Sequence, residues 1–137
     1  MKLLLTLLTV LLCGIFSQTV FADNSSLAGT YEGIIWSNAD EPGTTTFFYT
    51  TDQKIEGKYV FIDGLSGEGD KGTLNNCDLS GLILRCIWKD EWGAGDFLIE
   101  FEADFSSFSG QWFDDISEGR RDTTDESGHK WNGVRRK

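Results

Sequence analysis

Apolar and polar residues alternate with a period of two along most of this chain. In the clearest stretch every second residue from Phe97 to Phe105 is apolar, and Glu100, Glu102 and Asp104 lie between them. Such alternation is typical of a strand with one buried face and one wet face. Residues 54–61 and 82–89 show the same rhythm. Further strands are predicted at 30–36, 44–51, 72–76, 108–114 and 130–135.

Turn-forming residues separate these stretches. They cluster at 38–43, which holds the single proline, at 63–72, at 90–95 and in the polar segment 117–128. Glycine also recurs within the alternating stretches, at Gly33, Gly57, Gly81, Gly110 and Gly133. This spacing fits two strands and their turns per unit, as in a meander of hairpins. The pattern therefore predicts an all-β fold, a single antiparallel up-and-down barrel of about eight strands.

The first 22 residues follow a different pattern. Lys2 precedes an apolar run from Leu3 to Phe16, and Val20-Phe21-Ala22 forms a small-x-small cleavage site. The run is shorter than the roughly 20 residues that a membrane-spanning helix needs. We therefore expect a removed signal peptide over 1–22 and one barrel domain over 23–137. The expected location is secreted or periplasmic, without stable membrane insertion.

Charge narrows the partners that this domain can have. The chain has 22 acidic and 12 basic residues, a net charge of −10. Such a body repels phosphate backbones and anionic membrane surfaces, so nucleic acid is not an expected partner. Basic residues are concentrated after Gly119. This basic tail either docks on the acidic body of the same chain or binds a partner.

Cys77 and Cys86 are the two cysteines that follow the predicted signal peptide. An even pair in an exported chain favours a disulfide. A turn at Gly81-Leu82 would bring the two cysteines face to face across a hairpin. If the segment were one continuous strand, they would lie about 30 Å apart and could not be joined.

No residue pattern indicates a catalytic site. His129, the one histidine, lies in a polar stretch typical of the surface. A hydrolase using the Glu100 and Glu102 row is the least favoured hypothesis, because that row opposes an apolar row as a solvated face does. No cofactor is expected. Calcium near Asp63, Glu68 and Asp70 is the one ionic option, since the segment is rich in oxygen ligands.

Short motifs give the chain a resemblance to known barrels. They are Gly29-Thr30-Tyr31 near the start of the domain, the segments IEGKY and FSGQW, and the closing WNGVR. These resemble calycin-type barrels, the lipocalins and avidins, and also small exported bacterial domains that end in Trp-x-Gly-x-Arg. The resemblance implies a barrel closed by a stacked pair, with Tyr31 in place of the lipocalin tryptophan and Arg135 as the stacking cation. Glu32, Gly33, Ile34 and Ile35 follow where avidins carry polar biotin contacts, so biotin binding is not implied.

Aromatic residues support two hypotheses of function. The first is a binder of a small apolar ligand, with an interior void among five rings: Tyr59, Phe61, Trp88, Phe101 and Trp112. The second is a secreted protein-interaction module, an inhibitor or adhesion factor, with a filled core and an exposed apolar patch around Trp92. A filled interior and an aromatic pocket are both compatible with an eight-stranded barrel.

Overall fold

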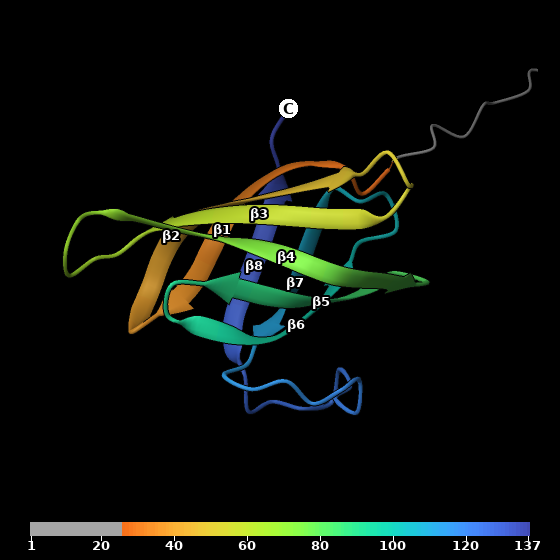
Figure 1. The fold of residues 1–137 in the computed structure, drawn as a ribbon. Coiled ribbons are helices and arrows are strands. Elements are labelled where there is room, and N and C mark those ends of the chain that lie inside the picture. The colour runs from red at the N-terminus through yellow and green to blue at the C-terminus, as the bar shows by residue number, and fades with distance from the viewer. Residues whose placement is uncertain (1–25) are drawn as a thin grey trace, which may run out of the picture.

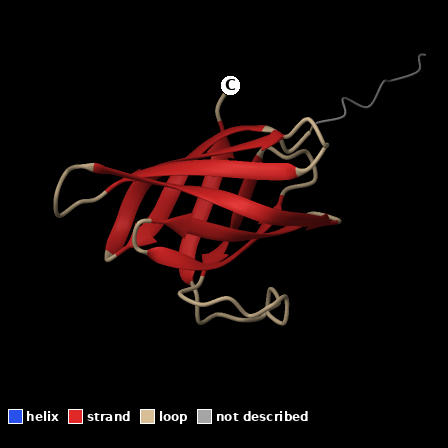
Figure 2. Cartoon of the chain, viewed as in Figure 1, coloured by secondary structure: helices blue, strands red, loops and turns tan. Residues whose placement is uncertain are grey.

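The computed structural model describes residues 26–137, so the predicted signal peptide lies outside the described residues. The described chain consists of strands, turns and loops, without a helix (Figure 2). The eight strands are β1 (Gly29–Ser37), β2 (Ala39–Tyr49), β3 (Ile55–Ile62), β4 (Gly69–Ser80), β5 (Ile83–Asp90), β6 (Gly93–Phe101), β7 (Ser107–Trp112) and β8 (His129–Arg135).

The strands form one closed antiparallel barrel in chain order, in which β8 returns to pair with β1 (Figure 1). This confirms the predicted up-and-down barrel of eight strands. The closing seam is irregular. The Ile34 amide donates to Asn132 Oδ1 over 2.9 Å, so a side chain replaces a backbone acceptor there.

Alternate residues of the strands face inward and fill the barrel. Glycines allow neighbouring chains to approach closely: a Cβ added at Gly110 would lie 2.2 Å from the carbonyl oxygen of Leu98. The apolar core consists of Leu27, Tyr31, Ile35, Phe47, Tyr59, Phe61, Leu74, Leu84, Cys86, Trp88, Phe97, Ile99, Phe101, Phe108 and Trp131.

The first hairpin is tighter than the sequence indicated. A turn over 38–43 was expected, but β2 begins at Ala39 and contains Pro42. Pro42 pairs with Ile34 of β1, whereas β3 pairs with β2 only from Gly43 onward. The missing N–H of proline is tolerated because one edge of β2 is unpaired at that position.

The third hairpin is also longer than predicted. β4 begins at Gly69 rather than at residue 72, because Gly69 and Asp70 pair with Ile62 and Phe61 at the end of β3. The loop is thereby shortened to residues 63–68. It is closed by the Gly67 amide, which donates to the carbonyl of Asp63 over 2.7 Å.

The predicted strand over 97–105 is displaced towards the N-terminus. β6 starts at Gly93 and ends at Phe101, so Glu102 and Asp104 lie in a turn and do not form a row with Glu100. Asp104 Oδ1 accepts a hydrogen bond from the Ser106 amide, and Phe105 adopts a φ of 55°. These turn interactions override an alternation that continues past the end of the strand.

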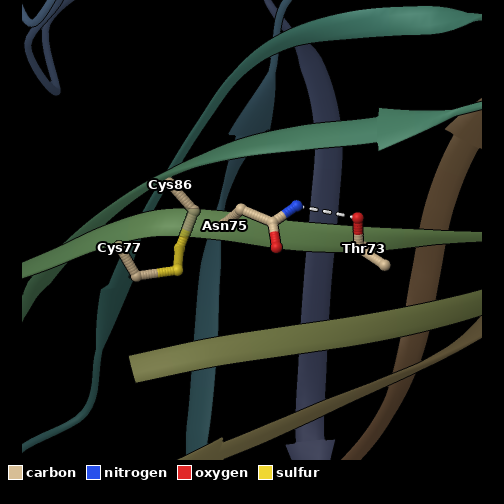
Figure 3. The surroundings of a disulfide bond; sticks show 4 residues. All are labelled: Thr73, Asn75, Cys77 and Cys86. Carbon is tan, nitrogen blue, oxygen red and sulfur yellow. Dashed lines mark hydrogen bonds between the residues drawn. A yellow bond between two sulfur atoms is a disulfide. The ribbon is translucent and has the colours of Figure 1, made fainter. Parts of the chain in front are cut away.

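The disulfide between Cys77 and Cys86 is formed, which settles the alternative that the sequence left open (Figure 3). Gly81 and Leu82 make the turn between β4 and β5, and Gly81 has the positive φ of 62° that such a turn uses. The register slips between Asn75 and Asp78, beside Cys77.

The two ends of the barrel differ in their connections. We call one end the mouth: it carries the β1–β2, β3–β4 and β5–β6 turns and the long segment 113–128 between β7 and β8. The other end, which we call the closed end, carries the remaining three turns and the entry of the chain at Leu27. Leu27 is fully buried there.

Candidate functional site

Aromatic rings pack against one another in the interior of the barrel, where the sequence predicted a void among five rings. Phe47 contacts Phe101 and Phe97, and Phe97 contacts Trp131 with ring centroids 4.7 Å apart. Trp131 in turn contacts Tyr59, also at 4.7 Å. Phe101 is therefore separated from the other four rings of the predicted ligand site. Inward-facing rings from several strands meet in the middle, and the assignment of Phe101 to the ligand site stays a prediction.

A pocket of about 100 Å³ opens instead at the mouth. Tyr59, Phe61, Trp88 and Trp112, the other four predicted rings, all line it. Trp92, predicted as an exposed aromatic, also lines the pocket and is 74% exposed. The complete lining is Ile35, Trp36, Ser37, Tyr59, Phe61, Trp88, Asp90, Trp92, Trp112 and Trp131. All five tryptophans of the chain thus meet in this one pocket.

Hydrogen bonds within the protein hold three of the indoles. Trp88 Nε1 donates to the carbonyl of Phe113 over 2.8 Å, and Trp112 Nε1 donates to the carbonyl of Trp36 over 2.9 Å. Trp131, at the floor of the pocket, donates to Thr45 Oγ1 over 2.9 Å. Because these N–H groups are already bonded, the three rings are preorganised. A ligand can therefore contact the surfaces of these three rings but not hydrogen-bond to their N–H groups.

Gly95 makes the Trp88 arrangement possible. A Cβ at Gly95 would lie 1.9 Å from the Phe113 carbonyl oxygen and 2.7 Å from Trp88 Nε1. Any larger residue would displace the indole or its acceptor. Trp88 is then packed edge-on against Trp112, with ring centroids 5.3 Å apart at 81°. Such edge-to-face packing is a favourable geometry for aromatic pairs.

Asp90 is the carboxylate of the pocket. Its Oδ2 accepts a hydrogen bond from the Tyr59 hydroxyl and its Oδ1 accepts one from the Trp92 amide, each over 2.8 Å. Burial, and then the hydrogen bond and charge of Asp90, raise the pKa of the Tyr59 phenol. The phenol therefore stays protonated and remains the donor. Within residues 26–137, Asp90 forms no ion pair.

A second carboxyl group, that of Glu41, is buried at the same end of the barrel. Glu41 is 7% exposed and shares the alternating buried face of β2 with Thr45 and Phe47. A Cβ at Gly64 would lie 2.6 Å from Glu41 Oε1, so the 63–68 loop covers the carboxyl group. In the described part of the chain, Glu41 likewise has no ion-pair partner.

His129 is not the solvated surface residue that its polar neighbours indicated. Its side chain is 29% exposed, and its ring is stacked on Trp36 with centroids 4.5 Å apart at 9°. The same ring contacts Trp112 at 4.4 Å. His129 Nε2 lies 3.2 Å from Asp114 Oδ2. Trp36 and Trp112, which line the pocket, are thus supported from outside by an imidazole.

The expected barrel-closing pair, Tyr31 and Arg135, lies at the closed end. The two residues are register partners across the β1–β8 seam, and the guanidinium carbon is 5.1 Å from the centre of the Tyr31 ring. Arg135 Nη2 donates to the Tyr31 hydroxyl over 2.7 Å. Its Nε donates to the carbonyl of Phe105 over 3.0 Å.

The segment 113–128 is docked on the outside of the barrel by Arg121. Arg121 pairs with Asp96 at 2.6 Å, Asp115 at 2.9 Å and Asp125 at 3.0 Å, and its guanidinium lies 3.8 Å from the Phe113 ring centre. Because Asp96 lies on β6, its ion pair with Arg121 ties this segment to the barrel. Hydrogen bonds from Ser127, followed by Arg121, hold the pKa of Asp125 below its usual value. A groove of about 510 Å³ runs beside this cluster and is lined by both Arg121 and Arg85.

The oxygen-rich loop considered for calcium does not gather its acids. Across residues 26–137, no group of three or more His, Cys, Asp and Glu side chains is placed to hold a metal ion. Asp63 Oδ1 accepts the Leu65 amide over 2.8 Å, and Ser66 Oγ accepts the Glu68 amide over 3.2 Å. These oxygens therefore serve the turn of the loop.

Comparisons with known proteins do not assign this chain to a family. No protein-family model, curated protein or solved structure matches the chain. Within residues 26–137 there is no helix long and apolar enough to cross a membrane.

Sequence reasoning did not group Trp36, Trp131 and Asp90 with the site. Trp131 faces inward in the alternation of β8, and a signal for it was present in the WNGVR segment. Trp36 and Asp90 stand at the ends of β1 and β5, where alternation no longer reports on which way a side chain points. Their placement follows from strand length and register.

Proposed function

We propose that this chain is an exported, calycin-like binding domain that takes a small, mainly apolar group into its mouth and performs no catalysis. The observation that carries the proposal is the convergence of five tryptophans, from β1, β5, β7, β8 and the β5–β6 turn, on one pocket. Concave, mainly aromatic sites with a few placed polar groups are the usual form of small-molecule sites.

The size of the pocket supports a small group rather than a lipid. A cavity of about 150 Å³ accommodates a benzene molecule, and the pocket at the mouth is about 100 Å³. The packed rings of the core lie beneath it, with Trp131 at 2% exposure. The bound group would therefore be the end of a ligand, with the remainder lying outside past Trp92.

Export is supported by two independent features. Residues 1–22 have the composition of a cleavable signal peptide. The Cys77–Cys86 disulfide is typical of proteins that leave the reducing cytoplasm. The eight-stranded up-and-down barrel is the architecture that calycins share, which supports the calycin-like part of the proposal.

A protein-interaction module is the second candidate. Val60 and Ile62 are each 44% exposed on the outer face of β3, and Leu65 in the following loop is 85% exposed. They belong to the β3–β4 hairpin, which extends at the left of Figure 1. Native mass spectrometry of protein purified from its own host separates the candidates, because a retained small molecule favours the first and a retained protein favours the second.

The pocket can be tested with the indole N–H signals of ¹⁵N-labelled protein, because all five indoles line it. Choline, cyclohexanol, phenol and 3,3-dimethylbutan-1-ol are suitable probes. We expect at least one to shift these signals with a Kd below about 1 mM, and Trp92→Ala to weaken that binding about tenfold. Phe48→Ala is the matched control, since Phe48 is a 38% exposed ring on β2 outside the pocket. If no probe moves the signals, or if Trp92→Ala and Phe48→Ala behave alike, the proposal is wrong.

A further inference from the structure

The charges around the mouth discriminate between kinds of small group. Asp90 is the one ionisable acid that lines the pocket, and no lysine, arginine or histidine lines it. Asp90 forms no ion pair with any described residue. By contrast, Asp40 in the neighbouring hairpin is paired with Lys130 at 2.7 Å. An anionic group would therefore enter against an uncompensated carboxylate, and a cationic group would compensate it.

The rings favour the same sign of charge. Aromatic faces carry the negative part of the ring quadrupole, and they attract a cation within about 6 Å of the ring centre, tryptophan most strongly. Five indoles and the rings of Tyr59 and Phe61 surround the pocket. The whole chain carries a net charge of −10, which raises the local concentration of cations around it.

The hydrogen-bonding groups favour a methylated cation over one with several N–H donors. Both oxygens of Asp90 already accept hydrogen bonds, from Tyr59 and from the Trp92 amide. The carbonyls of Phe113 and Trp36 already accept the indoles of Trp88 and Trp112. A primary ammonium has three N–H donors and would have to share these acceptors with the bonds already made, whereas a quaternary ammonium needs no acceptor and is held by ring faces and charge.

We propose that the group bound at the mouth is a quaternary or highly methylated ammonium, held by the tryptophan rings and neutralised by Asp90. This inference rests on the proposed function, because it names the ligand class of the same pocket. A compact methylated ammonium also suits a pocket of about 100 Å³.

The test compares three compounds of one shape and different charge: choline, its neutral isostere 3,3-dimethylbutan-1-ol, and the anion 3,3-dimethylbutanoate. Titrations are followed by the indole N–H signals. We expect choline to bind about tenfold or more tightly than the alcohol, and the anion to bind more weakly than both. Raising the salt concentration should weaken choline binding and leave the alcohol unaffected.

Variants then assign the preference to Asp90. Asp90→Asn should reduce the choline-to-alcohol preference to less than about threefold while the alcohol binds as before. Glu91→Gln is the matched control, because Glu91 is the exposed acid next in sequence and does not line the pocket. If Asp90→Asn does not fold, Asp90→Glu takes its place in the test. This variant keeps the carboxylate and should therefore retain the preference for choline over the alcohol.

The outcomes separate the two proposals. If choline and the alcohol bind equally, or if other probes bind and choline does not, the cation inference is wrong and the proposed function stands. If Asp90→Asn keeps the full preference for choline, the assignment to Asp90 is wrong. If none of the compounds binds, both the inference and the proposed function fail.

Discussion

The two ends of the barrel are both built from aromatic rings, yet they are completed in opposite ways. At the closed end the chain supplies its own cation: Arg135 lies over Tyr31 and donates to the carbonyls of Phe105, Ala28 and Ser26. At the mouth the rings are accompanied by the carboxylate of Asp90, and no basic residue lines the pocket. At the closed end the rings and their cation belong to the same chain, so the cluster stabilises the fold. At the mouth the rings are accompanied only by a carboxylate, so the cluster is suited to bind a cation from outside.

Arg135→Ala should give the largest effect on stability, because the closed end loses four guanidinium hydrogen bonds and the contact of the guanidinium with the Tyr31 ring. The Tyr31 hydroxyl and the carbonyls of Phe105 and Ala28 lose a charged donor. We expect the free energy of unfolding to fall by about 3 kcal/mol in a urea titration. The indole N–H signals of the mouth should respond to probes as in the wild type.

Arg136→Ala is the control for this prediction. Arg136 pairs with Glu32 on the outside of the barrel, where the two side chains are 58% and 53% exposed. Such an exposed pair contributes less than about 1 kcal/mol. If both arginine variants lose the same stability, the closed end is not held by Arg135 and the contrast between the two ends fails.

Loss of the disulfide should have the next largest effect on the free energy of unfolding. It joins β4 to β5, and its loop spans a sequence separation of 9. Closing a loop of this length in the unfolded chain stabilises the fold by about 2–3 kcal/mol. We expect a reducing agent to lower the free energy of unfolding of the wild type by that amount. The Cys77→Ala/Cys86→Ala variant should be equally destabilised and should not respond to the reductant.

A reductant effect that persists in the double variant would show that the loss comes from elsewhere. Binding of probes at the mouth should survive reduction, because neither cysteine lines the pocket. If reduction instead abolishes binding while the barrel stays folded, the structure of the mouth depends on the disulfide between β4 and β5. The two ends would then not be independent.

The comparison also shows what alternation in the sequence can and cannot predict. Alternation identified inward-facing rings such as Trp88 and Phe101, because a period of two distinguishes the two faces of a sheet. It could not say at which end of the barrel each ring would lie. That depends on register around the closed sheet, which placed Trp88 at the mouth and Phe101 beside Tyr31.

The sequence also could not predict where each strand ends. The Gly81-Leu82 turn and its disulfide could be anticipated, because turn chemistry and an even cysteine pair agree there. The strand predicted through Phe105 was wrong, because a local turn, in which Asp104 accepts a hydrogen bond from the Ser106 amide, ends β6 early. Asp90, the charge that defines the site, lies at such an end, where neither periodicity nor composition distinguishes a ligand from a solvated turn.

Tyr31 at the closed end and Tyr59 at the mouth should give the smallest effect on stability. Their pKa values also respond to the sign of the charge at each end of the barrel. Burial is the main cause that raises the pKa of both Tyr31 and Tyr59. At Tyr31 the charge of Arg135 offsets part of this increase, whereas at Tyr59 the hydrogen bond and charge of Asp90 add to it. The folded protein therefore keeps both phenolic protons at a pH where the unfolded chain, with a phenol pKa of about 10, has released them.

Stability from these two groups is fully present below about pH 10 and is lost as the pH rises further, because the unfolded state then binds fewer protons. Each buried phenol contributes up to about 1.4 kcal/mol of loss per pH unit in that range. Tyr31→Phe and Tyr59→Phe should each make the decline of unfolding free energy less steep, and the double variant should be the least steep. The ultraviolet absorbance of phenolate should show Tyr31 losing its proton at a lower pH than Tyr59. The reverse order would mean that the charges of Arg135 and Asp90 do not set the relative pKa values of the two phenols, and this comparison would then no longer support a cation at the mouth.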